Sequence, residues 1–208
     1  MTVVDSSYAI MAGFNYVAEH EGLPKVSHEL VMENIAAPMV AYCEALLGEY
    51  RPEWLELYRE GCKTFDRELI KPFDDTIPTL TKLKSMGIKV AVASNREKPS
   101  QALERTGLSK YFDVIVGAEE PFGFLPYKPN PAMLNEIMKY FNINLDDTVY
   151  VGDSDVDILT SMAANVRGIG ITKGTFTRED FNLLGAWKVI DGLGELIEIV
   201  KSDNADLK

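Results

Sequence analysis

The sequence predicts an α/β protein with a parallel β-sheet, helices on both faces of that sheet, and a small helical region ahead of it. Three observations support this prediction. Short apolar runs alternate with helical patterns from residue 73 onward, the region from 7 to 71 shows helical periodicity with no convincing strand, and polar residues directly follow several apolar runs. Repeated strand–helix alternation is typical of parallel sheets, because each helix carries the chain back to start the next strand.

The region from 7 to 71 is predicted to contain only helices. In YAIMAGFNYVAEHEG, apolar residues such as Phe14 and Val17 recur at helical spacing, and Gly22 is a helix stop signal. The stretch HELVMENIAAPMVAYCEALLGEY is also helical, with a break expected near Pro38. PEWLELYREGCKTFDRELI continues the pattern, so this region is predicted to form a small helical unit.

The remainder of the chain alternates between strands and helices. IKVAVAS (88–94) is a continuous apolar run, which is expected for a strand buried on both faces of a sheet. The helix before it is predicted to end at Gly87. The other predicted strands are DVIVGA (113–118), TVYVGD (148–153), RGIGIT (167–172) and WKVID (187–191). In such sheets, ligands bind beyond the carboxyl ends of the strands.

Composition excludes several classes of function. The 208 residues carry a formal net charge of −11, so the surface repels nucleic acid and anionic membranes. Cys43 and Cys62 form no C-x-x-C pair, and we expect two reduced thiols rather than a zinc site or disulfide. The two histidines, His20 and His28, lack metal-ligand spacing. No long apolar run suits a membrane span and no signal peptide is recognisable, so a cytoplasmic location is predicted.

Polar residues with complementary chemistry follow two of the predicted strands. Ser94 and Asn95 end VAVASN, and Lys128 lies in YKPNP. A hydroxyl and an ammonium group are suited to binding phosphoryl oxygens. Asp153 ends the strand TVYVGD and Asp157 follows it, and carboxylates at a strand end suit Mg²⁺ because this cation prefers oxygen ligands.

The order and spacing of these residues resemble the haloacid dehalogenase superfamily of phosphohydrolases, in the branch typified by phosphoglycolate phosphatase. Ser94 matches the second motif of that family, and Lys128 matches the third. Gly152, Asp153 and Asp157 match the fourth motif, G-D-[ST]-x-x-D. Each motif alone is weakly specific, but the three occur in the right order and the resemblance covers nearly the whole chain.

The resemblance implies a Rossmann-like parallel sheet core, formed by residues 1–6 and 72–208, with an inserted helical cap over residues 7–71. It implies a Mg²⁺-dependent phosphatase that hydrolyses a small phosphorylated metabolite similar to phosphoglycolate. The implied metal ligand is Asp153. The implied catalytic residues are Lys128, Ser94 and Asp157, and the implied substrate-binding residues are Ser94, Asn95 and Lys128. No nucleic-acid or membrane partner is expected.

The sequence departs from the family at the first motif, D-x-D-G-T-L-x-D-S. Residues 2–6, TVVDS, resemble the tail of this motif, which would place both motif aspartates before residue 1. In the family, the first aspartate is the nucleophile and the second is the general acid/base. We therefore expect the first core strand to be absent, Mg²⁺ binding to be weakened or absent, and this chain to be inactive. Asp5 is a poor substitute for the nucleophile because it lies on a predicted loop.

Several alternatives remain open at this stage. The chain is either a shortened form of a phosphatase or a non-catalytic pseudo-phosphatase that binds a phospho-ligand or a partner protein. The space of the first strand could close up or be filled by another segment or partner chain, and an exposed gap would favour a homodimer. Asp153 or Asp155 could instead cap the following helix, and Asp157 could be a first-turn acid favoured by the helix dipole. A receiver-like domain is disfavoured by the helical region.

Overall fold

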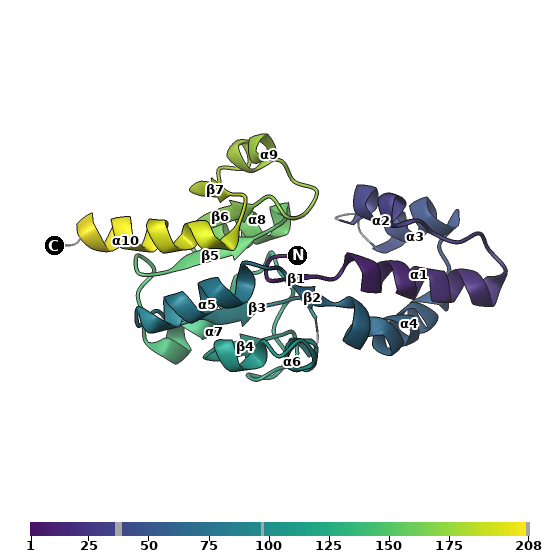
Figure 1. Ribbon diagram of the computed structural model, residues 1–208, viewed down its shortest axis with the longest axis horizontal. Helices are drawn as coiled ribbons and strands as arrows, with labels where there is room; N and C mark the ends of the chain where they lie inside the picture. The colour runs from purple at the N-terminus through teal and green to yellow at the C-terminus, as the bar shows by residue number, and fades with distance from the viewer. Residues whose placement is uncertain (36–38, 97, 207–208) are drawn as a thin grey trace. The chain divides into compact units, whose positions relative to one another are not determined.

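The computed structural model describes residues 1–35, 39–96 and 98–206 (Figure 1). The chain divides into two compact units. One consists of Val4–Lys71, and the other combines Met1–Val3 with Pro72–Lys208. The first is a helical unit and the second is an α/β unit. In the described ranges, no helix is long and apolar enough to cross a membrane.

The helical unit agrees with the helices that the sequence predicts. It contains α1 (Ser7–Glu21), α2 (His28–Asn34), α3 (Met39–Leu47) and α4 (Trp54–Leu69). Helix α1 ends at Gly22, which adopts the left-handed conformation with φ of 69°. The break predicted near Pro38 lies outside the described residues. The expectation of helices alone is wrong at the edge of this region, where β1 (Val4–Asp5) pairs with β2 (Lys71–Pro72) as a two-stranded sheet.

A close approach between α1 and α4 organises the helical unit. The two helices share a core with α2 and α3 that includes the fully buried Phe14 and Trp54. Gly61 of α4 faces α1 so closely that an added Cβ would lie 2.7 Å from Tyr16 Cβ and 3.0 Å from Gly13 Cα. Because real Cβ atoms essentially never come this near to other heavy atoms, this helix pair requires glycine at position 61.

We expect Gly61→Val to lower the free energy of unfolding by about 1–3 kcal/mol, because the added side chain overpacks the interface between α1 and α4. Thermal unfolding followed by circular dichroism measures this loss. Lys63→Val, at an exposed position of the same helix, is the control for the helix propensity of valine. Equal melting temperatures for the two variants would contradict the predicted close contact.

The α/β unit contains five of the strands in two parallel ladders. In one ladder β3 (Ala91–Ala93) pairs with β4 (Val114–Val116), and in the other β5 (Val149–Gly152), β6 (Arg167–Ile171) and β7 (Lys188–Ile190) pair in that order. These strands are shorter than the apolar runs predict. The first residue of the run that begins at Ile88 bonds to the preceding helix instead, because the Ile88 amide donates to the Leu83 carbonyl at 3.1 Å.

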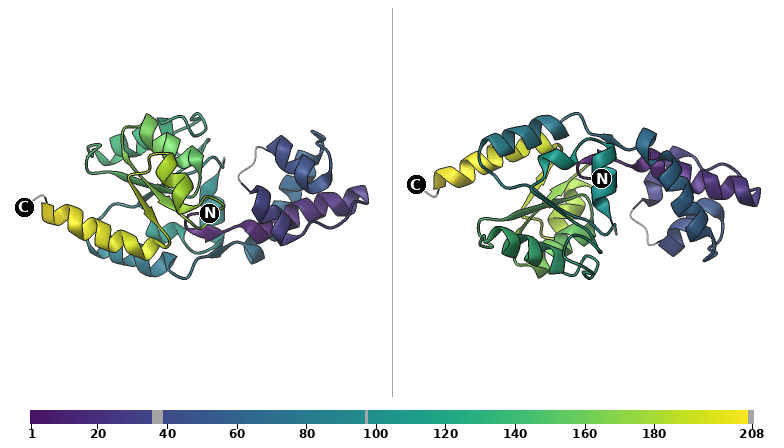
Figure 2. Two further views of the ribbon diagram at one scale, coloured as in Figure 1. Left: turned by 90° about the horizontal axis from the view of Figure 1, so that it is seen from above. Right: turned by 90° about the horizontal axis from the view of Figure 1, so that it is seen from below.

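Helices cover both faces of the strands, as the sequence predicts (Figures 1 and 2). One face carries α7 (Ala132–Phe141), α8 (Asp155–Ala163) and α9 (Arg178–Leu183), and the other carries α5 (Thr76–Ser85) and α10 (Leu196–Asp206). Helix α6 (Pro99–Arg105) lies beside β4, and two short 3₁₀ turns, η1 (Ser109–Tyr111) and η2 (Leu193–Glu195), complete the unit. The period of two along β5 sends Tyr150 to the α7 face and its neighbours to the α10 face.

The two ladders remain separate. Within the described residues, β3 and β5 do not pair, so the alternative in which the sheet closes up is wrong. The prediction that the strand in 88–94 is buried on both faces is also wrong, because all three residues of β3 are only partly buried, whereas Ile169 and Ile171 of β6 are fully buried. An edge that lacks a neighbouring strand leaves its residues partly open to solvent.

Candidate active site

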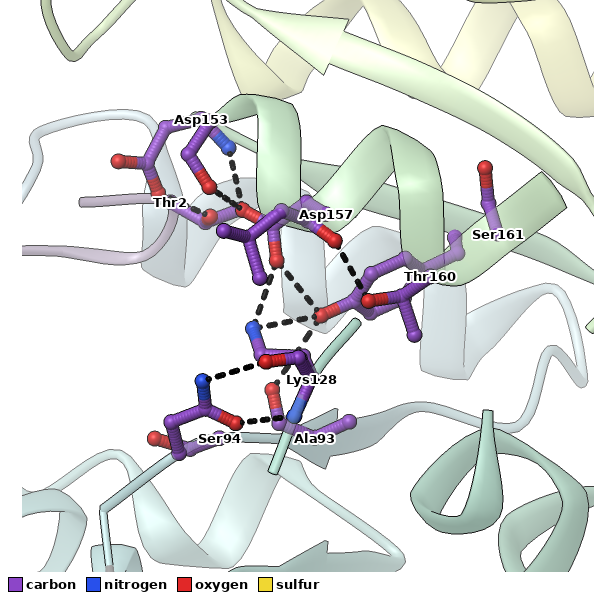
Figure 3. Close-up of polar contacts among 12 residues, drawn as sticks. Thr2, Ala93, Ser94, Lys128, Asp153, Asp157, Thr160 and Ser161 are labelled. Atoms are coloured by element: carbon purple, nitrogen blue, oxygen red, sulfur yellow. Dashed lines mark hydrogen bonds and ion pairs between the residues drawn. The ribbon is translucent and has the colours of Figure 1, made fainter. Parts of the chain in front are cut away.

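The carboxyl ends of β3 and β5 bring together the polar residues that the sequence singles out (Figure 3). Ser94 and Asn95 follow β3, Asp153 follows β5, and Asp157 lies in the first turn of α8. Lys128 comes from the segment between β4 and α7. These five residues therefore converge on one end of the strands, which is where parallel sheets place their ligand sites.

A buried ion pair joins two of the three motifs. Lys128 Nζ lies 2.6 Å from Asp157 Oδ1, and the two side chains are only 12% and 8% exposed. Burial raises the pKa of Asp157, but the Lys128 ammonium and the hydroxyls of Ser154 and Tyr150 outweigh it, so the pKa lies below its usual value. Asp157 is therefore ionised at neutral pH and holds Lys128 in one place.

Asp157 also organises the backbone at the end of β5. Its Oδ2 accepts hydrogen bonds from the Asp153 amide at 3.1 Å and the Ser154 hydroxyl at 2.8 Å. The side chain packs so tightly on Gly152 that a Cβ there would lie 2.1 Å from Asp157 Cβ. The G-D-[ST]-x-x-D spacing therefore describes one compact turn. Asp157 lies in the first turn of α8, as the alternative reading predicts, and its buried carboxylate also orients Asp153 and Ser154.

Asn95 connects the end of β3 to the lysine. Its Oδ1 accepts from the Lys128 amide at 2.7 Å, and its Nδ2 donates to the Lys128 carbonyl at 3.3 Å. The exposed Asn95 side chain thus binds the Lys128 backbone through both its N–H and its C=O group. Ser94 is fixed to β4 through its amide, which donates to the Val116 carbonyl, while its Oγ accepts from the Arg96 amide at 3.2 Å. The Ser94 hydroxyl hydrogen can be donated to a ligand.

Two residues at the start of the chain contact the Asp153 carboxylate. Thr2 Oγ1 donates to Asp153 Oδ1 at 2.9 Å, and the Met1 ammonium forms an ion pair with the same oxygen. The Asp153 side chain is 19% exposed, so a ligand can reach it. Helix α8 has Ser154 at its N-cap position with no side-chain capping bond, and Asp155 Oδ1 accepts from the Val156 amide. Asp153 therefore does not cap the helix.

Asp153 could offer Mg²⁺ one carboxylate ligand, although its Oδ1 already contacts the Met1 ammonium and the Thr2 hydroxyl. Mg²⁺ commonly uses one or two carboxylates and completes its shell with water and phosphate oxygens. Asp157 is engaged by Lys128 and is not available to the cation. Over the part of the chain that the structure describes, no group of three or more histidine, cysteine, aspartate or glutamate side chains could hold a metal ion.

Tyr150 belongs to the site but was missed by sequence reasoning. Its hydroxyl donates to Asp157 Oδ1 at 2.9 Å and accepts from Lys128 Nζ at 3.0 Å. Burial, followed by the charge of Asp157, raises the pKa of the phenol well above its usual value. The available signal was the period of two in VYVGD, which turns Tyr150 away from Val149 and Val151.

Asp5 has a local role in the helical unit. Its Oδ1 accepts from both the amide and the hydroxyl of Ser7, at 2.9 and 2.6 Å, where α1 begins. Asp5 belongs to β1 rather than to the loop that the sequence predicts. A carboxylate oxygen that accepts two hydrogen bonds is a weakened nucleophile.

Comparison with known proteins assigns the family. The model for haloacid dehalogenase-like hydrolases matches residues 1–171. The chain therefore belongs to the haloacid dehalogenase-like hydrolase family, which confirms the resemblance predicted from Ser94, Lys128 and Asp153.

Relatives with assigned activities act on small phosphorylated compounds. A phosphoglycolate phosphatase of Vibrio parahaemolyticus is 27% identical, over 96% of this chain and 92% of the relative. A glyceraldehyde 3-phosphate phosphatase of Methanocaldococcus jannaschii is 31% identical, over 78% of this chain and 71% of the relative. A solved haloacid dehalogenase-like family hydrolase of Streptococcus pneumoniae shares the fold, with a TM-score of 0.80 and 18% identity over 96% of this chain and 93% of that chain.

Replacing Lys128 tests the buried ion pair. We expect Lys128→Met to lower the free energy of unfolding at neutral pH by about 3–5 kcal/mol, because the buried Asp157 carboxylate loses its counter-ion. In the wild type, the lowered pKa of Asp157 contributes stability above the unfolded value of about 3.9, and this contribution is lost as the pH falls through the folded value.

The deficit of Lys128→Met should therefore shrink as the pH falls from 7 toward 4, because the unpaired, buried Asp157 takes up a proton in this range. Urea unfolding at several pH values measures it. Lys139→Met is the matched control, because Lys139 forms an exposed ion pair with Glu136 and should change stability little. A deficit that is independent of pH would show that Asp157 is not the group left unpaired.

Proposed function

We propose that the α/β unit binds the phosphoryl group of a small phosphorylated metabolite, at a site built for Mg²⁺-dependent phosphatase chemistry. One observation carries this proposal: the network from Asn95, the residue after Ser94, through Lys128 to Asp157 connects the three segments that carry the motifs. Isolated motifs can arise by chance, but hydrogen bonds that connect residues far apart in the sequence place these groups at one point. The names of the relatives support a small phosphorylated ligand.

Each residue has a distinct role in this proposal. Ser94 donates its hydroxyl hydrogen to a phosphoryl oxygen, and Lys128 places its positive charge on another. Asn95 and Asp157 fix the position of Lys128. Asp153 supplies the carboxylate ligand for Mg²⁺, which when bound neutralises negative charge on the acids and the phosphate.

The charges of the site make phosphate binding depend on the cation. Lys128 and the Met1 ammonium contribute two positive charges, and Asp153 and Asp157 contribute two negative charges, so these four groups sum to zero. A phosphate dianion gains little attraction from that sum. Addition of a divalent cation changes the sum to +2 and attracts the dianion.

We propose further that the chain of 208 residues binds its ligand without turnover. The D-x-D-G segment that supplies the nucleophile and the acid/base in the family does not occur in residues 1–208. Removal of a covalent nucleophile typically costs several orders of magnitude in rate. Ligand binding uses other residues, so it does not require the missing segment.

Two measurements on the purified chain test these proposals. We expect no phosphate release from 2-phosphoglycolate or glyceraldehyde 3-phosphate with Mg²⁺, above a protein-free control. Calorimetry with inorganic phosphate should show binding that needs Mg²⁺ and that falls at least tenfold in Lys128→Met, which loses a charge-assisted hydrogen bond of about 1.5–3 kcal/mol.

The outcomes separate the two parts of the proposal. Metal-dependent turnover that persists through repurification and is lost in Lys128→Met would overturn the inactivity and retain the phosphate site. Absence of phosphate binding, with or without Mg²⁺, would overturn the site itself. Lys139→Met is again the control, because it removes an exposed lysine outside the network.

A further inference from the structure

A second ion pair in the α/β unit, between Asp75 and Lys173, lies outside the network described above. Lys173 Nζ is 2.5 Å from Asp75 Oδ1, and the lysine side chain is only 14% exposed. Asp75 Oδ2 accepts from the Leu193 amide at 2.7 Å. The pair thus ties the start of α5 to the loop after β6 and to η2. Burial raises the pKa of Asp75, but the Lys173 and Leu193 contacts outweigh this effect and lower it.

The loop that carries Lys173 forms one wall around Asp153. The next residue, Gly174, packs so closely that an added Cβ would lie 2.9 Å from the Asp153 carbonyl oxygen and 3.2 Å from its Oδ2. A displacement of this loop would therefore change the space available to the Asp153 carboxylate. Lys173 is the charged side chain that fixes the loop next to that contact.

A second wall around Asp153 is fixed by Phe73 and Thr76, which flank Asp75 in the chain. Thr2 donates to Asp153 Oδ1, and the carbonyl of the next residue, Val3, accepts two hydrogen bonds. Val3 accepts from the Thr76 hydroxyl at 2.8 Å and from the Phe73 amide at 3.4 Å. The turn at 73–76 therefore holds the segment that contacts Asp153.

The aromatic ring in the same turn connects the two walls. Lys173 Nζ lies 4.2 Å from the centroid of the Phe73 ring, in addition to its ion pair with Asp75. The ammonium group is thus held by two residues of the turn that also binds Val3. The ion pair between Asp75 and Lys173 consequently links the two segments that contact the Asp153 carboxylate.

We propose that Asp75 and Lys173 are a positioning pair that sets the Asp153 carboxylate between Thr2 and Gly174 for cation binding. The proposal rests on the metal role of Asp153 proposed above. The pair acts through the walls of the site and does not touch the ligand. Direct phosphate binding by Lys173 is disfavoured because its ammonium is already bound by Asp75 and by the Phe73 ring.

The chain offers a matched control for simple stabilisation. Asp113 accepts from Lys84 Nζ at 2.9 Å through one oxygen and from the Val90 amide at 2.9 Å through the other. Its contacts therefore repeat those of Asp75, and its pKa is likewise lowered by these contacts against the effect of burial. Asp113 precedes β4 at the amino end of the strands, away from Asp153.

The experiment compares Asp75→Asn with Asp113→Asn in the full chain. Calorimetry with Mn²⁺, and thermal unfolding without metal, are measured for both variants and for the wild type. We expect both variants to melt at a similarly reduced temperature, and Asp75→Asn alone to bind Mn²⁺ about tenfold more weakly, because partners around a ligand typically cost 10–100-fold in metal affinity when removed. Lys173→Arg, which can keep the ion pair, should retain affinity better than Lys173→Met.

A second readout does not depend on the metal. In amide NMR spectra without metal, the signals of Asp153 and Gly174 should shift in Asp75→Asn and stay in place in Asp113→Asn. Equal Mn²⁺ affinities in the two variants, or unshifted Asp153 and Gly174 signals, would overturn the positioning role. If the wild type binds no Mn²⁺, the metal role of Asp153 fails, and the NMR comparison still decides whether Asp75 positions Asp153.

Discussion

The buried ion pair between Lys128 and Asp157 is the interaction on which the site depends. Taking two charges out of water is costly, so such a pair persists only when further hydrogen bonds satisfy its members. Tyr150 and Ser154 supply these bonds to Asp157, and Asn95 fixes the lysine peptide. The contacts that satisfy the pair come from the ends of β3 and β5, so the same hydrogen bonds stabilise the two charges and hold the site residues together.

The separation of the two ladders is the second feature that shapes the α/β unit. Among the described strands, β3 and β5 lack a common neighbour, and each backbone group left unpaired at a buried edge costs about 1–3 kcal/mol. One side chain spans from β5 to β3, because the Tyr150 hydroxyl, which donates its hydrogen to Asp157, lies 3.4 Å from the Ala93 carbonyl. Polar side chains at the strand ends, rather than a continuous backbone ladder, connect the two halves of the unit.

Sequence patterns anticipated much of this fold for identifiable physical reasons. The helix α1 follows from apolar residues at helical spacing and ends where Gly22 can adopt a positive φ. The predicted strands are too long, because an apolar run does not show which of its residues hydrogen-bond to the end of the preceding helix. Ile88 is such a residue. The apolar pattern of 88–94 did not show that β3 lacks a neighbour on one side, and only the family resemblance, with its absent first strand, anticipated this.

The sequence by itself determined the family, the order of the motifs and the end of the strands at which Ser94, Lys128 and Asp153 would meet. These properties depend on residue type and spacing, which a linear pattern carries. Only the tertiary structure decided that Asn95 hydrogen-bonds the Lys128 backbone and that the Tyr150 hydroxyl hydrogen-bonds the Lys128 ammonium. It also decided that Gly174, the residue after Lys173, packs against Asp153. Such contacts join residues separated by tens of positions, and their partners are chosen by the packing of the whole unit.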